Sequence, residues 1–420
     1  MGLSSLQGFL AAYLLGPEGY GILGMVVMFA TSINRLLSFR MNEMVIKFAG
    51  QYLASDESEQ AAAVIKLAAL VEAGTSIIAY GLLVLLAPLA ARYIIKDPLT
   101  SSWVTVYGLI ILVNLVTETS TAVLHIGGHF RSQAVLNLAQ SVTTTTLVVI
   151  AFFVRGDVLS VLVAYLVGKV VFGLGTVGVA LYWMKPTIGA GWWRVPLNTV
   201  DNWRQMIRFA ISTNVSGTVN MVIRDSEVLW VGFFLSPLEA GYYKFGLAVM
   251  NVILMPITPF ISTTYPEINK AIARKGWAYL RSLIGRTTQI ALAWTVLCGL
   301  GMALLGPFFL GWFKQGAYLP SYAVILILLV GFGIANIFFW SRTLLLSFGM
   351  PDYPLKVTLV VGVLKTALMF VLVRPFGYLA QAALLSGYFV FSVGLIVVRG
   401  WRELHRAEKE DLSFGAGGSA

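Results

Sequence analysis

Long apolar runs dominate the chain and recur with short polar interruptions from one end to the other. Most of them approach the roughly 20 residues that a helix needs to cross a bilayer, and none alternates polar and apolar residues at every second position. The pattern predicts twelve membrane-spanning helices joined by short loops. These spans cover residues 3–15, 20–39, 62–86, 103–125, 134–154, 158–184, 207–235, 243–265, 287–313, 320–348, 354–373 and 378–398.

The composition agrees with a chain that lies mostly in lipid. Hydrophobic residues make up 58% and charged residues 11% of the 420 residues, and the mean hydropathy is +0.82. The net charge of +10 resides mainly in the loops, where basic residues set orientation rather than bind nucleic acid. Seventeen Lys and Arg residues fall in the connections on the side of both termini, against six on the other side. We therefore expect an all-α protein of the cytoplasmic (inner) membrane with both termini in the cytoplasm.

Two landmarks recur with a common displacement. The turn LGPEGYG at 15–21 resembles LSPLEAGYY at 235–243, and Gly19 reappears as Gly241, 222 residues later. The turn that contains Gly127 reappears at Gly349 with the same displacement. Repeats of this kind are common in transporters. The repeat predicts two pseudo-symmetric six-helix bundles around a central cavity.

This repeat also predicts the domain organisation. Residues 1–184 form the N-terminal lobe, 185–206 a Trp-rich cytoplasmic linker, 207–399 the C-terminal lobe and 400–420 a cytoplasmic tail. Only 14 residues precede Leu15, whereas the corresponding span has 28 residues. The first helix is therefore expected to be truncated at its amino end.

The span at 207–235 carries charges in its interior. Charged side chains at that depth are costly, and their presence suggests a functional role. On a continuous helix, Asn220, Arg224 and Glu227 would lie on one face, whereas Asp225 would point about 100° away from Arg224. We therefore expect Glu227 to be the counter-charge of Arg224 and Asp225 to be poorly placed to neutralise it.

Other cations accompany Arg224 inside the spans. Lys169 and Lys365 lie too deep to reach water at the membrane edge, and Arg35 belongs to a polar face of the second span. An excess of cations favours an anionic ligand, and the planar Arg guanidinium suits phosphate oxygens. The predicted substrate-binding set, with Arg224 as principal anchor, is Arg224, Arg35, Lys169, Lys365 and Asn220.

The acidic residues Glu118, Asp225 and Glu227 are candidates for a coupling ion, either H⁺ or Na⁺. Each of them could equally be a counter-charge for a neighbouring Arg or Lys. The three histidines are not accompanied by a Cys or carboxylate cluster, so neither a metal site nor another cofactor is expected. The outer connections are too short for an enzymatic domain, which disfavours a membrane-bound polymerase or ligase. A transporter is expected rather than an enzyme.

Several motifs are similar to those of a known family. They are the LGPEGYG turn, the acidic residue within the seventh span followed by Gly241-Tyr242-Tyr243, the YPEI segment at 265–268, and Gly349. In this order they resemble Wzx-type polysaccharide flippases of the MOP exporter superfamily. The resemblance implies a flippase that moves an undecaprenyl-pyrophosphate-linked oligosaccharide across the cytoplasmic membrane by alternating access. The pyrophosphate would then bind at Arg224, and the partners would be the lipid-linked oligosaccharide, membrane lipids and other polysaccharide-assembly proteins.

Two alternatives belong to the same superfamily. A lipid II-type flippase is one, although relatives of that branch often have two further spans. A multidrug exporter of the MATE type is the other, and its cavity for organic cations should be dominated by carboxylates. The spans of this chain hold six basic residues against four acidic ones, which favours the glycolipid flippase.

Overall fold

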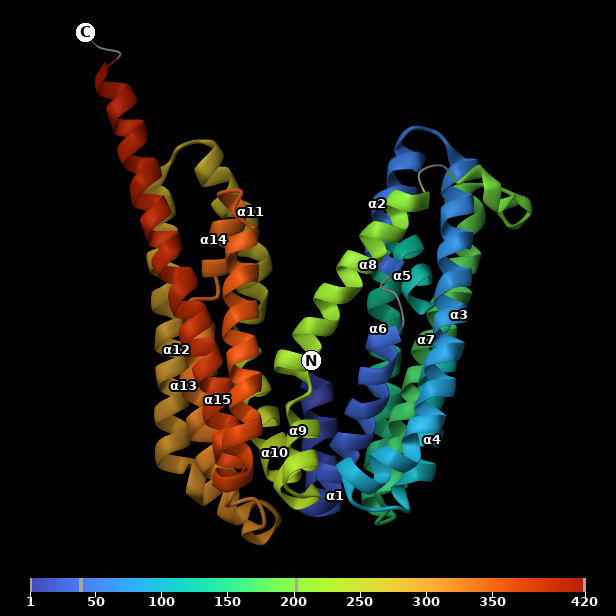
Figure 1. Ribbon diagram of the computed structural model, residues 1–420, viewed down its shortest axis with the longest axis vertical. Coiled ribbons are helices and arrows are strands. Elements are labelled where there is room, and N and C mark those ends of the chain that lie inside the picture. Colours follow the sequence, from blue (N-terminus) through green and yellow to red (C-terminus); the bar gives the residue numbers. More distant parts are fainter. Residues whose placement is uncertain (1, 38–40, 201–202, 418–420) are drawn as a thin grey trace. The chain divides into compact units, whose positions relative to one another are not determined.

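The computed structural model describes residues 2–37, 41–200 and 203–417, with side chains except those of Ser216, Ser262 and residues 412–417. Within these residues the secondary structure is helical throughout (Figure 1). Contacts divide the chain into two compact units, Gly2–Gly241 and Tyr242–Ala420. The division after Gly241 reflects which residues contact one another and does not test the boundaries of the repeat. The predicted lobe boundaries at 184 and 207 therefore stay a prediction.

The first unit is made of helices and short helical turns. Its elements are α1 (Gly2–Leu37), α2 (Met41–Ala54), α3 (Ser58–Ala90), η1 (Ala91–Ile95), α4 (Thr100–Val113), α5 (Thr117–Ile126), α6 (Phe130–Phe153), α7 (Val158–Ile188), η2 (Trp192–Arg194), η3 (Leu197–Thr199), α8 (Trp203–Asn220), η4 (Met221–Asp225), α9 (Glu227–Phe234) and the start of α10 (Pro237–Leu254).

The second unit contains the rest of α10 and the remaining helices. They are α11 (Thr258–Ala273), α12 (Trp277–Trp312), η5 (Phe313–Gly316), α13 (Ser321–Ile337), α14 (Ser341–Ser347) and α15 (Asp352–Gly417).

Two of these elements each contain two predicted spans. In α1 the backbone breaks at Gly16, with φ of 71°, immediately before Pro17. In α15 it breaks at Gly377, also with φ of 71°. A left-handed φ suits glycine because no Cβ is present to clash. The turns predicted between the first and second spans and between the last two are thus confirmed.

The chain is a multi-pass membrane protein. In the described residues, eight helices are long and apolar enough to cross a membrane, or nine if α10 and α11, bent by 58° at residues 255–257, form one span. Dividing α1 and α15 at their glycines and adding the interrupted helix at 203–234 accommodates the twelve predicted spans. The predicted fold class, an all-α protein of two six-helix bundles, is confirmed. The predicted cavity between the bundles stays a prediction.

The internal repeat is visible in matching helix ends. Gly128 and Gly349 have φ of 72° and 74°. Each follows a helix end closed by a hydrogen bond to a carbonyl five residues back, His129 N to Leu124 O at 2.7 Å and Met350 N to Leu345 O at 2.9 Å. The two turns therefore correspond through Gly128, one residue after the glycine that the sequence match selected.

A second correspondence is reciprocal. A Cβ at Gly21 of α1 would overlap the carbonyl oxygen of Pro237, and a Cβ at Gly241 of α10 would overlap that of Pro17. In both helices the glycine is the fourth residue after the proline, so Gly21 rather than Gly19 is the counterpart of Gly241. The predicted match of Gly19 with Gly241 is wrong, because a continuous helix cannot absorb two extra residues within one turn.

The Trp-rich linker packs on the first unit. The Lys66 amine on α3 donates hydrogen bonds to the carbonyl oxygens of Trp193 at 3.0 Å and Val195 at 3.1 Å. Beside this contact, a cluster of buried residues joins α2, α3, α5, α7 and the start of α8, with Phe48 and Met206 among its members. The linker is thus anchored to one end of the first unit, and the cytoplasmic location of that end stays a prediction.

Candidate functional site

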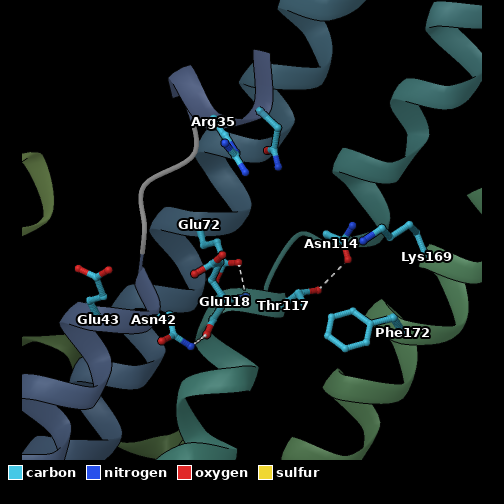
Figure 2. Close-up of a pocket in the computed structure, with 10 residues that line it drawn as sticks. Arg35, Asn42, Glu43, Glu72, Asn114, Thr117, Glu118, Lys169 and Phe172 are labelled. Carbon is cyan, nitrogen blue, oxygen red and sulfur yellow. Dashed lines mark hydrogen bonds between the residues drawn. The ribbon is translucent and has the colours of Figure 1, made fainter. Parts of the chain in front are cut away.

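A polar pocket lies inside the first unit, among helices that are otherwise apolar. Its volume is about 370 Å³, within the range of pockets that bind small ligands. Figure 2 shows the side chains that converge on it from α1, α2, α3, α7 and the break between α4 and α5. The lining residues are Asn34, Arg35, Asn42, Glu43, Glu72, Asn114, Thr117, Glu118, Lys169 and Phe172.

The pocket forms where the fourth span is interrupted. The helix α4 ends at Val113 and α5 begins at Thr117. At the break, the Asn114 amide nitrogen donates to Ile110 O at 2.9 Å, and its oxygen accepts a bond from the Thr117 hydroxyl at 3.1 Å. The amide groups at the start of α5 have no helical partner and need another acceptor.

That acceptor is Glu72. Its side chain is 1% exposed and accepts hydrogen bonds from the backbone N–H groups of Glu118 at 2.8 Å and Thr119 at 2.9 Å, and from the Thr119 hydroxyl at 2.7 Å. A carboxylate at a helix N-terminus is also favoured by the helix dipole. From the sequence, Glu72 is only one of the four acidic residues counted within the spans, because its partners lie 46 and 47 residues further along the chain.

Two of the predicted anion-binding cations line this pocket. Arg35 comes from α1, and Lys169 reaches in from α7 beside Asn114 (Figure 2). Among the described residues, the Lys169 amine makes no hydrogen bond or ion pair. The buried Asn34 Oδ1 likewise has no hydrogen-bond partner in this part of the chain. The Lys169 amine is therefore available to a ligand.

The charge of the pocket is mixed. Two cations face Glu43, Glu72 and the predicted ion-coupling residue Glu118. The carboxylate of Glu72 already accepts hydrogen bonds from the start of α5. The Asn42 amide donates to the backbone oxygen of Glu118, at 3.3 Å, and not to its carboxylate. The excess of cations that the sequence predicts is therefore not a property of this pocket.

Arg35 connects the pocket to the charged segment of the seventh span. Its Nη1 lies 2.8 Å from Asp225 Oδ2, and Arg224 Nε lies 3.1 Å from Asp225 Oδ1. The side chains are 42% (Arg35), 52% (Arg224) and 33% (Asp225) exposed. Two guanidinium groups share one carboxylate, which leaves one positive charge in excess. The prediction that Asp225 is poorly placed to neutralise Arg224 is wrong.

The reason is that the seventh span is not one continuous helix. The helix α8 ends at Asn220, η4 is a π-helical turn, and the Ser226 N–H bonds to the carbonyl of Met221, five residues back, at 3.0 Å. Asn220 is exposed, but Glu227, which begins α9, is 1% exposed. The predicted common face of Asn220, Arg224 and Glu227 is therefore wrong, since the π-turn rotates the chain between them.

Lys365, the remaining predicted cation, lies on α15 in the second unit and is 3% exposed. The structure thus brings Arg35 and Lys169 into one pocket and joins Arg224 to it through Asp225. A shared space for all four cations stays a prediction, as do the ligand-binding roles of Asn220 and Lys365. In the described residues, no group of three or more His, Cys, Asp or Glu side chains could hold a metal ion.

Residues 1–272 match the family described as "Polysaccharide biosynthesis protein". The chain belongs to the polysaccharide biosynthesis protein family. This assignment agrees with the resemblance to polysaccharide flippases drawn from the sequence motifs. A search of curated proteins finds no match.

Solved structures show the fold. A multidrug resistance MATE family transporter of the MOP superfamily, in its inward-facing conformation, is 12% identical with a TM-score of 0.76 and aligns over 97% of this chain and 95% of its own. The lipid II flippase MurJ, in an inward closed conformation, is 13% identical with a TM-score of 0.71, over 98% and 88%. A MOP superfamily transporter from Pyrococcus furiosus is 12% identical with a TM-score of 0.65, over 97% and 93%. The chain therefore has the MOP superfamily fold, and these neighbours are transporters or flippases.

Proposed function

We propose that this protein is a flippase that moves an undecaprenyl-pyrophosphate-linked oligosaccharide across the cytoplasmic membrane by alternating access. The family description supports a role in polysaccharide biosynthesis. The fold is shared with a protein named as a lipid II flippase. The excess of basic loop residues on the side of the termini supports a cytoplasmic location for both of them. Membrane lipids and other polysaccharide-assembly proteins are the further partners of this proposal.

The observation that carries the proposal is the sharing of Asp225 by Arg35 and Arg224. Excess positive charge within a span is costly unless a ligand or a partner compensates it. A pyrophosphate does so well, because guanidinium groups bind its oxygens through paired, charge-assisted hydrogen bonds. Arg224 is the principal anchor in this proposal, Arg35 and Lys169 assist on the pocket side, and Asn220 and Lys365 complete the set.

The same cluster offers a means of coupling to an ion. The carboxylate of Asp225 competes with the substrate for both guanidinium groups. Proton uptake by Asp225 would remove that competitor and release Arg35 and Arg224 to the pyrophosphate, and proton loss would favour discharge. Glu118, which lines the pocket, and buried Glu227 are the other candidate sites for H⁺ or Na⁺.

The test is transport of a fluorescent lipid-linked oligosaccharide in proteoliposomes. Arg224→Ala should abolish transport, and Arg224→Lys should keep part of it because an ammonium supplies charge without the paired donors. Arg208→Ala is the matched control, since Arg208 is an exposed residue of the same α8–α9 segment. A normal transport rate for folded Arg224→Ala would overturn the assigned anchor.

The mixed charge of the pocket favours one rival. Three carboxylates against two cations would suit an organic cation, as in a multidrug exporter of the same fold. The proteoliposomes distinguish the two functions directly. Efflux of a fluorescent organic cation without movement of the lipid-linked oligosaccharide would replace the flippase proposal with the exporter.

A further inference from the structure

An apolar groove lies beside the Arg35–Asp225–Arg224 cluster, within the first unit. It has a volume of about 500 Å³ and is bounded by α1, by the end of α3 with η1, and by η4 with α9. Phe29 and Ile33 contribute from α1, Leu89 and Tyr93 from α3 and η1, and Trp230 from α9. The groove is distinct from the polar pocket, with which it shares no lining residue.

The groove offers almost nothing for a polar ligand to bind. Its polar groups at the seventh span are engaged within that span, because the Ser226 hydroxyl and the Trp230 ring N–H both point to the carbonyl of Val222, at 3.2 and 3.4 Å. The π-turn explains this arrangement: the Ser226 N–H bonds to Met221 instead, and Val222 O is left for the side chains. An occupant of the groove would be held by apolar contact alone.

The groove is open along one side. Its floor is buried, with Phe29 at 8%, Ile33 at 5% and Met221 at 4% exposure, whereas Leu36 and Leu89 at the rim are 42% and 52% exposed. The exposed side chains at the rim are themselves apolar. A flexible hydrocarbon chain fits such a groove.

The charged cluster adjoins the groove. Along α1 the lining residues end at Leu36, directly after Arg35. On the seventh span, Arg224 and Asp225 lie between the lining residues Val222 and Ser226. An apolar groove beside an excess positive charge is complementary to an amphiphile with an anionic head and a hydrocarbon chain.

We propose that this groove holds the isoprenoid chain of the lipid-linked substrate while Arg35 and Arg224 hold its phosphate. The inference rests on the proposed function and adds to it the place of the lipid chain. The occupant is a polyprenyl phosphate. The lipid would lie between α1, α3 and α9, with its first isoprene units next to the guanidinium groups and the remainder leaving through the open side.

Photocrosslinking tests the proposal on the full chain. The protein is reconstituted in phosphatidylcholine nanodiscs with an undecaprenyl phosphate analogue that carries a photoreactive group in its first isoprene units, and the crosslinked peptides are mapped. We expect crosslinks in α3–η1 and α9. Undecaprenyl phosphate without the photoreactive group should compete, whereas phosphatidylglycerol, which has the same kind of anionic head and different chains, should not.

Variants on α3 provide a matched pair. Leu89→Trp fills the rim of the groove and should lower crosslinking by roughly tenfold. Overpacking that costs somewhat more than 1 kcal/mol of binding free energy lowers the affinity by about this factor. Leu85→Trp is the control: Leu85 is 74% exposed on the same helix and does not line the groove. Because mapping on the unaltered protein needs no variant, a failure of Leu89→Trp to fold leaves the test intact.

The outcomes separate this proposal from the proposed function. Crosslinks that map outside the groove, or equal competition by phosphatidylglycerol, would overturn the groove assignment even if the protein transports the lipid-linked oligosaccharide. Crosslinks in the groove that Leu89→Trp abolishes would support it. If proteoliposomes transport no lipid-linked oligosaccharide while prenyl phosphate still crosslinks in the groove, the groove assignment survives and the flippase proposal fails.

Discussion

Arg35 and Asp225 form an ion pair of 2.8 Å between residues 190 positions apart in the chain. Both side chains are partly exposed, so the pair should stabilise the fold by only about 0.2–1 kcal/mol. We predict that a double-mutant cycle of Arg35→Gln and Asp225→Asn gives a coupling in thermal stability within this range. Each single variant should nevertheless reduce oligosaccharide transport at least about tenfold. Stability and transport that fall in proportion would indicate a structural role for the pair.

Glu72, in contrast to that ion pair, is predicted to contribute strongly to the stability of the fold. Replacing it by Gln keeps the shape but turns one acceptor oxygen into an NH₂ donor that faces the donors of Glu118 and Thr119. We expect Glu72→Gln to lower the free energy of unfolding by about 1–3 kcal/mol, the cost of leaving buried donors unsatisfied. Glu43→Gln, at an exposed position of the same pocket, should be neutral in the same thermal-unfolding assay. Equal stability of the two variants would refute the proposed support of α5.

Gly21 is predicted to tolerate no side chain. A methyl group there would overlap the Pro237 carbonyl, and overpacking of this kind costs about 1–3 kcal/mol. Gly81→Ala on α3 is the control, because no atom lies within 4 Å of a Cβ built there and alanine favours a helix. We expect Gly21→Ala to lower the thermal-unfolding temperature in detergent and Gly81→Ala to leave it unchanged or raise it. Similar unfolding temperatures would argue against the close crossing.

The end of α15 is predicted to be held to the basic turn between α11 and α12. Lys275 Nζ lies 2.5 Å from Asp411 Oδ1, the Trp277 ring N–H donates to Asp411 Oδ2 at 3.2 Å, and Arg281 pairs with Glu408. The hydrogen bond from Lys275 is the main cause that lowers the pKa of Asp411. Lys275→Ala should speed proteolysis of the tail, with Lys270→Ala, whose partner Glu267 is one helical turn away, as the control.

The sign of the pH dependence follows from that lowered pKa. A carboxyl group with a depressed pKa contributes stability that is present above its ordinary pKa and is lost as the pH falls through the depressed value. Tail protection should therefore persist at neutral pH and disappear only in strong acid. Protection that is lost on raising the pH from 6 to 8 would contradict this account.

The sequence was sufficient to predict the spans because bilayer thickness imposes a length and a composition on each of them. The repeat could also be read from the turns at Pro17 and Pro237, since turn chemistry is local. The residue-by-residue register between the two halves could not be determined from the sequence alone. Only the helices show that Gly241 is matched by Gly21 and that Gly349 is matched by Gly128.

The candidate site was predicted in part. Depth in the membrane was enough to select Lys169 and Arg224, since charge at that position needs a reason, whereas Arg35 was selected from the polar face of the second span. The pairing of Asp225 with Arg224 was missed because helical periodicity assumes an unbroken helix. No residue type in the sequence indicates the π-turn at Met221–Asp225. The role of Glu72 was missed because it depends on where α5 begins, which is a property of the tertiary fold.

The reciprocal crossing of Gly21 and Gly241 has the form of an isologous contact, in which each partner presents the same patch to the other. In a symmetric homodimer of half-length chains, one glycine codon would serve both sides of such a contact. Once the two halves are joined in a single gene, one codon no longer encodes both glycines. Two codons must then keep glycine independently, and a mutation in either half displaces the first helical turn of the other.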